Sequence, residues 1–176
     1  VVATTYDYDW AEGERQFKAA MAREPVTPGI RHMNAYFNLR LTGRADEAIA
    51  EHYRAIEQDP LNMIFRVGLA ASLTSAGRDA EASQTVDALM DLAPDFPGTY
   101  GLLARNVARE PIERALAFAE RFHALDMWHT ASSGLLAGLR RRNGDTARAA
   151  ELMSHAGRPE EYGNAVGYAL YHLGSG

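Results

Sequence analysis

A short phrase that returns at a fixed interval constrains this chain more than any other feature of its sequence. Residues 43–48, Gly-Arg-Ala-Asp-Glu-Ala, come back 34 positions later at 77–82 as Gly-Arg-Asp-Ala-Glu-Ala. A looser copy, Gly-Asp-Thr-Ala-Arg-Ala, lies at 144–149 and leaves room for one degenerate copy before it. A period of about 34 residues with helical signals in every unit predicts a stacked array of helix pairs.

The first complete unit, residues 28–60, shows how each repeat is expected to fold. Its first helix opens at Pro28 and ends at Gly43, because proline suits a first helical turn and glycine readily adopts the left-handed conformation after a helix. Its second helix carries one apolar face and ends before Pro60. The same scheme predicts one repeat domain over 1–176, with half repeats at 1–25 and 159–176 and further full repeats at 62–94, 97–127 and 129–157.

Small residues recur where neighbouring helices must approach each other closely. Alanine occupies the same place in every second helix, at Ala48, Ala82, Ala115 and Ala149. Glycines four residues apart stand at 134 and 138 and again at 163 and 167. Their flanks are shorter than the roughly 20 apolar residues that span a bilayer, so we expect close helix packing and no membrane association.

These residues resemble the tetratricopeptide repeat (TPR) family, whose unit combines small and apolar positions with a turn glycine and a closing proline. The best-matched copy supplies Tyr36, Leu39, Gly43, Ala48, Ala55 and Pro60, and the next supplies Leu69, Ala70, Leu73, Gly77, Ala82 and Pro94. The resemblance implies an all-α fold, a right-handed α-α superhelix of about ten antiparallel helices. Two departures are His52, which replaces the usual aromatic residue, and Met127, which stands where a proline is expected.

The resemblance also implies a role in protein–protein interaction and says where a partner would bind. In the TPR family, inward-facing positions of successive first helices line a concave groove. Carried over by register, the partner-binding groove consists of Met33, Phe37, Arg40, Val67, Arg105, Arg109, Arg141 and Tyr168. Because guanidinium groups bind carboxylates in pairs of hydrogen bonds, the expected partner is a protein or peptide with an acidic segment. The alternative is that these arginines only complement the dipole at helix C-termini.

Composition argues against several other classes of function. The net charge of −5 disfavours sequence-independent nucleic-acid binding, and the absence of cysteine removes disulfides, thiolate catalysis and cysteine-bound zinc. The six histidines show no metal-ligand spacing, so no metal or other cofactor is expected. Ser132 and Ser133 lie near His129, but we expect them to cap a helix rather than to form a nucleophile–base pair. The chain is therefore not expected to be an enzyme.

The sequence leaves several possibilities open for the parent protein and for the function of the chain. Residues 8–25 are similar to TPR domains that some bacterial regulators carry C-terminally, so a regulatory or scaffolding domain of a larger bacterial protein is expected. Both ends lack polar capping helices, which predicts continuation of the parent protein or self-association through the end faces. The absence of a targeting signal predicts a cytoplasmic location. Pentatricopeptide-like binding of single-stranded RNA and structural support of a missing enzyme domain are the two alternative functions.

Overall fold

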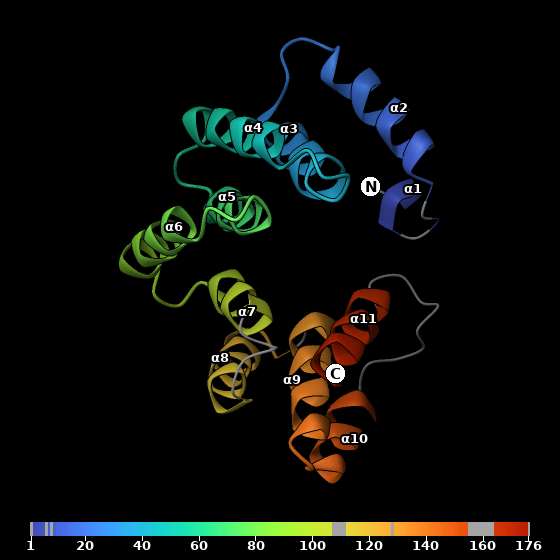
Figure 1. Ribbon diagram of the computed structural model, residues 1–176, viewed down its shortest axis with the longest axis vertical. Helices are drawn as coiled ribbons and strands as arrows, with labels where there is room; N and C mark the ends of the chain where they lie inside the picture. Colours follow the sequence, from blue (N-terminus) through green and yellow to red (C-terminus); the bar gives the residue numbers. More distant parts are fainter. Residues whose placement is uncertain are drawn as a thin grey trace. The chain divides into compact units, whose positions relative to one another are not determined.

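The structure is a computed structural model that describes residues 2–5, 7, 9–106, 112–127, 129–154 and 164–175 (Figure 1). All regular structure in these residues is helical, which confirms the all-α fold. The chain divides into two compact units, Val1–Pro94 and Asp95–Gly176, which we describe separately. That 1–176 forms a single repeat domain stays a prediction.

Unit 1 is a chain of helices in which each one packs against the next. Two helices, α1 (Val2–Thr5) and α2 (Trp10–Met21), precede the first complete repeat. The first helix of that repeat is α3 (Pro28–Asn34) continued without a break by the π-helix η1 (Ala35–Leu39), and its second helix is α4 (Ala45–Gln58). The next repeat consists of α5 (Met63–Ser75) and α6 (Asp79–Leu92). Its first helix packs against α4, and α6 packs against it in turn.

The recurring phrase of the sequence is the turn that joins the two helices of a repeat. Gly43 and Gly77 have φ angles of 80° and 72°, in the region that glycine adopts without steric cost. The N–H of Arg44 donates to the carbonyl of Leu39 at 2.8 Å, and that of Gly43 donates to Arg40 at 3.4 Å. This pair of bonds is the Schellman motif, which satisfies the last carbonyls of a helix. Gly144 repeats it with a φ of 86°.

Alanine residues form the contact between the helices of each repeat. In the first repeat Ala35, Leu39 and Ala48 make one buried cluster. The next repeat joins Leu69, Leu73 and Ala82 to Ile49 of α4. The four alanines that the sequence places in second helices are all buried, with exposed fractions of 0, 6, 0 and 3% for Ala48, Ala82, Ala115 and Ala149. Close helix approach at these positions is therefore confirmed.

In its described residues, unit 2 contains five helices around one buried cluster. They are α7 (Pro97–Asn106), α8 (Ile112–Leu125), α9 (Thr130–Arg142), α10 (Thr146–Ser154) and α11 (Asn164–Ser175). The cluster centres on Leu135, Leu136 and Leu139 of α9, which packs against α8, α10 and α11. At the start of α9 the ring of His129 accepts the capping hydrogen bond from the N–H of Ala131. The expectation that Ser132 and Ser133 cap this helix is wrong, because both lie inside its first turn.

Glycines bring α9 and α11 into backbone contact. A Cβ atom at Gly134 would overlap the carbonyl oxygen of Gly167, and one at Gly138 would overlap the carbonyl oxygen of Tyr171. One at Gly174 would lie 2.8 Å from the backbone nitrogen of Leu139. The contacts advance together along both helices, so α9 and α11 run parallel. Close packing is confirmed for three of the four glycines of the sequence pattern, and Gly163 lies outside the described residues.

This contact predicts which glycines tolerate a side chain. In Gly134→Ala the new methyl group meets backbone, which cannot rotate away, so α9 and α11 must separate. We expect a loss of about 1–3 kcal/mol in the free energy of unfolding, measured by urea denaturation with circular dichroism. The matched control is Gly29→Ala, whose Cβ would meet nothing within 4 Å. Equal unfolding free energies for the two variants would contradict the backbone contact.

Candidate functional site

The first helix of the first repeat departs from regular α-helical geometry where the sequence predicts a partner-binding surface. The N–H of Arg40 donates to the carbonyl of Ala35 at 3.0 Å, five residues back instead of four. The buried amide of Asn38 donates to that of Asn34 at 3.0 Å, and the hydroxyl of Thr42 donates to the carbonyl of Asn38 at 2.9 Å. One residue is thus added to a helical turn, a feature that is frequent at functional sites.

Two aromatic rings and one guanidinium group form a compact cluster on this π-helical turn. The rings of Tyr36 and Phe37 lie 5.0 Å apart between centroids at 71°, an edge-to-face contact. The guanidinium carbon of Arg40 lies 4.4 Å from the centroid of Tyr36, within the range of a cation–π interaction. All three side chains are half-buried. The guanidinium of Arg40 is therefore held against the face of a ring. We call Tyr36, Phe37 and Arg40 the aromatic–arginine cluster.

Exposed apolar side chains accompany this cluster. Met33 of α3 and Leu41 of the turn that follows η1 are 41% and 47% exposed. Ile64 is 41% exposed at the start of α5, the helix that packs against both α4 and η1. Of the predicted groove residues in unit 1, Met33, Phe37 and Arg40 thus lie on one helical segment with their side chains at least partly accessible. Val67 is only 4% exposed and contributes to the core.

The remaining predicted groove residues belong to unit 2. The side chain of Arg105 is half-buried and donates from Nε to the carbonyl of Gly101 in its own helix at 3.0 Å. Arg141 is exposed and donates from Nη1 to the hydroxyl of Tyr171 at 2.7 Å. Arg109 and the side chain of Tyr168 lie outside the described residues. A single groove lined by all eight residues stays a prediction.

The dipole explanation of the arginines also finds support in their positions. Arg105 lies in the last turn of α7, and Arg141 lies in the last turn of α9 with arginines on both sides. Arg40 and Arg141 each stand three residues before the turn glycine of their repeats, and each packs on a tyrosine ring. Cations at helix C-termini are stabilised by the dipole whether or not they bind a partner. Placement alone therefore does not separate the two explanations.

A buried pair of histidines lies beneath the aromatic–arginine cluster. His52 is fully buried, and its Nδ1 lies 2.9 Å from the carbonyl oxygen of Ala48. Its Nε2 lies 3.2 Å from Nδ1 of His32, whose ring also stacks on Tyr36. The carbonyl of Ala48 can only accept, so Nδ1 of His52 carries a hydrogen and donates it to this carbonyl. Nε2 of His52 then accepts a hydrogen bond from the Nδ1–H group of His32. Gly68 of α5 leaves room for both rings, because a Cβ there would overlap His52.

Both histidines are kept neutral by their surroundings. Burial lowers the pKa of His32 to about 4. Burial, with a further contribution from the nearby His32, lowers the pKa of His52 to about 3. This pair is not predicted from the sequence; the one signal for it is that His52 stands where the repeat usually has an aromatic residue. Among the residues that the structure describes, no group of three metal-binding side chains is present.

Comparison with known proteins agrees with this helical architecture. Residues 39–105, from the end of η1 to the last turn of α7, match the model of the tetratricopeptide repeat family. This stretch of the chain is therefore similar to tetratricopeptide repeats. No curated protein matches it. TPR arrays are protein-interaction scaffolds and are typically non-catalytic, and this is the general function that the match supports. None of the helices in the described ranges is long and apolar enough to cross a membrane.

The histidine pair predicts an acid-sensitive first unit. The unfolded chain takes up protons at an ordinary histidine pKa of about 6.5, whereas the folded chain resists protonation down to about pH 4. The stability contributed by the neutral pair is therefore fully present above about pH 6.5 and is lost as the pH falls towards 4. We expect each histidine to lower the free energy of unfolding by on the order of 3 kcal/mol over this interval.

The measurement is a series of urea denaturation curves between pH 7 and pH 4. The double variant with His32→Gln and His52→Gln should show a shallower dependence on pH. His172→Gln, which changes an exposed histidine of α11, should keep the dependence of the parent chain. Parallel curves for the double variant and the parent would show that the buried pair does not titrate in this way.

Proposed function

We propose that this TPR chain binds a partner polypeptide on the first helices of unit 1, around the aromatic–arginine cluster. The observation that carries the proposal is the cluster itself, a guanidinium packed 4.4 Å from a tyrosine centroid beside a second aromatic ring. Aromatic and arginine side chains are among the residue types that most often dominate the energy of protein interfaces. The ring contacts hold them in place before binding, which lowers the entropy cost of association.

The chemistry of the surface selects the kind of segment that it binds. Met33, Leu41 and Ile64 offer apolar area that a partner can cover, and Arg40 offers a cation beside it. A segment with one or two apolar side chains and a neighbouring carboxylate complements both features. Because Arg40 is half-buried, its interaction with a carboxylate is screened less by salt than an exposed pair would be.

The proposal also covers residues of unit 2 and the larger protein to which the chain belongs. Arg105, Arg109, Arg141 and Tyr168 serve as further partner-binding residues of unit 2, and the chain serves as a regulatory or scaffolding domain of a larger cytoplasmic bacterial protein. Support of an attached enzyme domain would use the same surface with a segment of the parent protein as its partner. Binding of single-stranded RNA finds no supporting observation, and the net charge of −5 opposes it.

A peptide selection tests the proposal directly. Peptides selected from a random displayed library on the purified chain should be enriched in an apolar residue next to Asp or Glu. Their dissociation constants are then measured by fluorescence anisotropy. We expect Arg40→Glu and Phe37→Ala each to weaken binding by about tenfold or more, because each removes one anchor of the cluster.

The matched control is Arg23→Glu, which reverses an exposed arginine that follows α2. It should bind the selected peptides as the parent chain does. Circular dichroism and thermal unfolding of all variants show whether each remains folded. Selected peptides that bind equally to the parent, to Arg40→Glu and to Phe37→Ala would overturn the assignment of this surface.

A further inference from the structure

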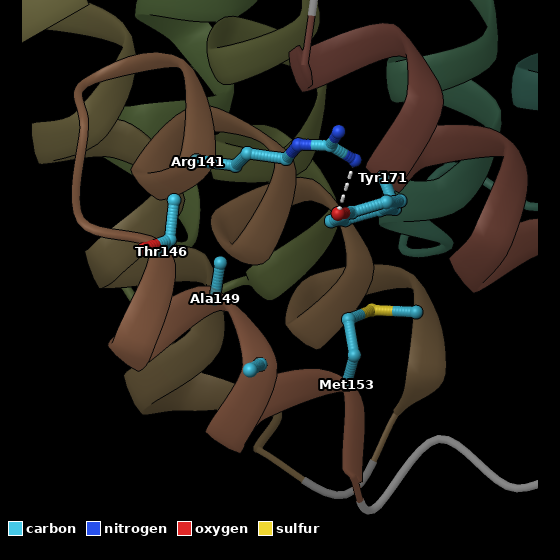
Figure 2. Close-up of a pocket in the computed structure, with 6 residues that line it drawn as sticks. Arg141, Thr146, Ala149, Met153 and Tyr171 are labelled. Carbon is cyan, nitrogen blue, oxygen red and sulfur yellow. Dashed lines mark hydrogen bonds between the residues drawn. The ribbon is translucent and has the colours of Figure 1, made fainter.

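A cavity in unit 2 lies between the three helices α9, α10 and α11. Its volume is about 320 Å³. Its walls come from four residues of α10 and one residue each of α9 and α11: Thr146, Ala149, Ala150, Met153, Arg141 and Tyr171. Figure 2 shows Arg141 and Tyr171 reaching towards each other along one side, with Thr146, Ala149 and Met153 of α10 along the other. The cavity is remote in sequence from the aromatic–arginine cluster, and it shares Arg141 with the partner-binding residues proposed above.

The cavity arises from the way in which α11 packs. In unit 1 the first helix of a repeat, α5, packs against the preceding second helix, α4, and Gly68 covers His52. Met153 of α10 occupies the repeat position of His52, nine residues after the turn glycine. The glycine contacts, however, hold α11 against α9, and it makes no comparable contact with α10. Among the described helices, α11 therefore does not cover the face of α10 that contains Met153.

The walls of the cavity are apolar and one edge is cationic. Ala149, Ala150 and the thioether of Met153 offer an apolar surface that an aliphatic or aromatic group can contact. The guanidinium of Arg141 lies 5.7 Å from the ring centroid of Tyr171 and donates to its hydroxyl at 2.7 Å. That hydroxyl accepts from Arg141, so its own proton is available to a second acceptor. Two donors thus lie side by side at one edge.

The carboxylates near this edge already interact with other arginines. Arg140 pairs with Glu120 and lies 3.7 Å from Asp145, and Arg148 pairs with Glu151 at 2.6 Å. Within the described ranges no carboxylate forms an ion pair with Arg141. In the same part of the chain its guanidinium donates to the hydroxyl of Tyr171 and not to a carboxylate or a backbone carbonyl, and its side chain lines the cavity.

We propose that this cavity is a binding site for a small carboxylic acid with a compact apolar group. The apolar group fills the space beside Ala149, Ala150 and Met153. The carboxylate accepts hydrogen bonds from the guanidinium of Arg141 and from the hydroxyl of Tyr171. The volume of about 320 Å³ lies at the small end of the range for ligand pockets, roughly 300–1,000 Å³, and so selects acids of the size of a phenylalkanoate.

The test uses 3-phenylpropanoate as the probe, with its amide and 3-phenylpropylamine as neutral and cationic analogues. Binding is followed by NMR through the ¹³C-labelled methyl group of Met153, which Met153→Leu assigns among the six methionines. We expect the acid to shift this signal with a Kd of about 0.1–1 mM, the range for a ligand of this size. The amide should bind about tenfold more weakly, and the amine should not bind measurably.

Two variants and one control separate the parts of the site. Arg141→Gln should reduce the affinity for the acid to that for the amide and leave the amide unchanged. Ala150→Phe, at an exposed position, should fill the cavity and abolish binding of both. Arg114→Gln on α8 should bind as the parent chain does. Equal affinity of the parent for the acid and the amide would overturn the proposal. So would an unshifted Met153 signal at about 10 mM acid, roughly ten times the weakest expected Kd.

A carboxylate on an apolar group can come from a free metabolite or from the last residue of a polypeptide. The tripeptide acetyl-Gly-Gly-Phe presents the second source. Tighter binding of this tripeptide than of 3-phenylpropanoate assigns the cavity to a chain end, and weaker binding assigns it to free acids. Both outcomes support an apolar carboxylate as the ligand class, and failure of both probes to shift Met153 would reject it.

Discussion

The architecture of both units depends on one backbone constraint, the left-handed glycine that ends the first helix of a repeat. At Gly43, Gly77 and Gly144 the chain reverses within two residues, and the N–H of the following residue closes on a carbonyl five positions back. The turn fixes where the second helix starts, and this places an alanine of that helix against the first one. The same local geometry thus determines the Schellman cap, the alanine packing and the outward surface of the first helix.

The packing between successive repeats depends on which preceding helix the glycines of the next first helix contact. In unit 1 Gly68 of α5 presses on the second helix of the preceding repeat, and the space beneath it holds two histidines instead of an aromatic side chain. In unit 2 the glycines of α11 face α9, and the equivalent position of α10 borders an open cavity. The same repeat geometry therefore gives a buried histidine pair in unit 1 and an accessible, largely apolar pocket in unit 2.

Much of the fold could be predicted from the sequence because its signals are local. Turn glycines, closing prolines and the alanine period determine helix ends and faces, and these agree with the structure. The π-helical turn at Ala35–Leu39 could not be predicted, because it depends on a buried Asn34–Asn38 hydrogen bond and on the packing of α4. Val67 was predicted to line the groove and is instead in the core, because the register of a helix says little about how deeply its neighbours cover it. The pairing of His32 with His52 could not be predicted either, because the two residues lie 20 positions apart on different helices.

The arginines divide into two classes with different consequences. Those at or after the turns pair with a glutamate three residues on, as Arg44 does with Glu47 at 2.6 Å and Arg78 with Glu81 at 2.6 Å. Exposed pairs of this kind add little stability, and their charges are largely cancelled locally. Arg40 and Arg141, three residues before a turn glycine, lie instead on tyrosine rings. An aromatic ring positions a guanidinium through the cation–π interaction, without itself carrying a negative charge. In a chain with a net charge of −5, a functional role for arginine is best sought at these two positions, one in each unit.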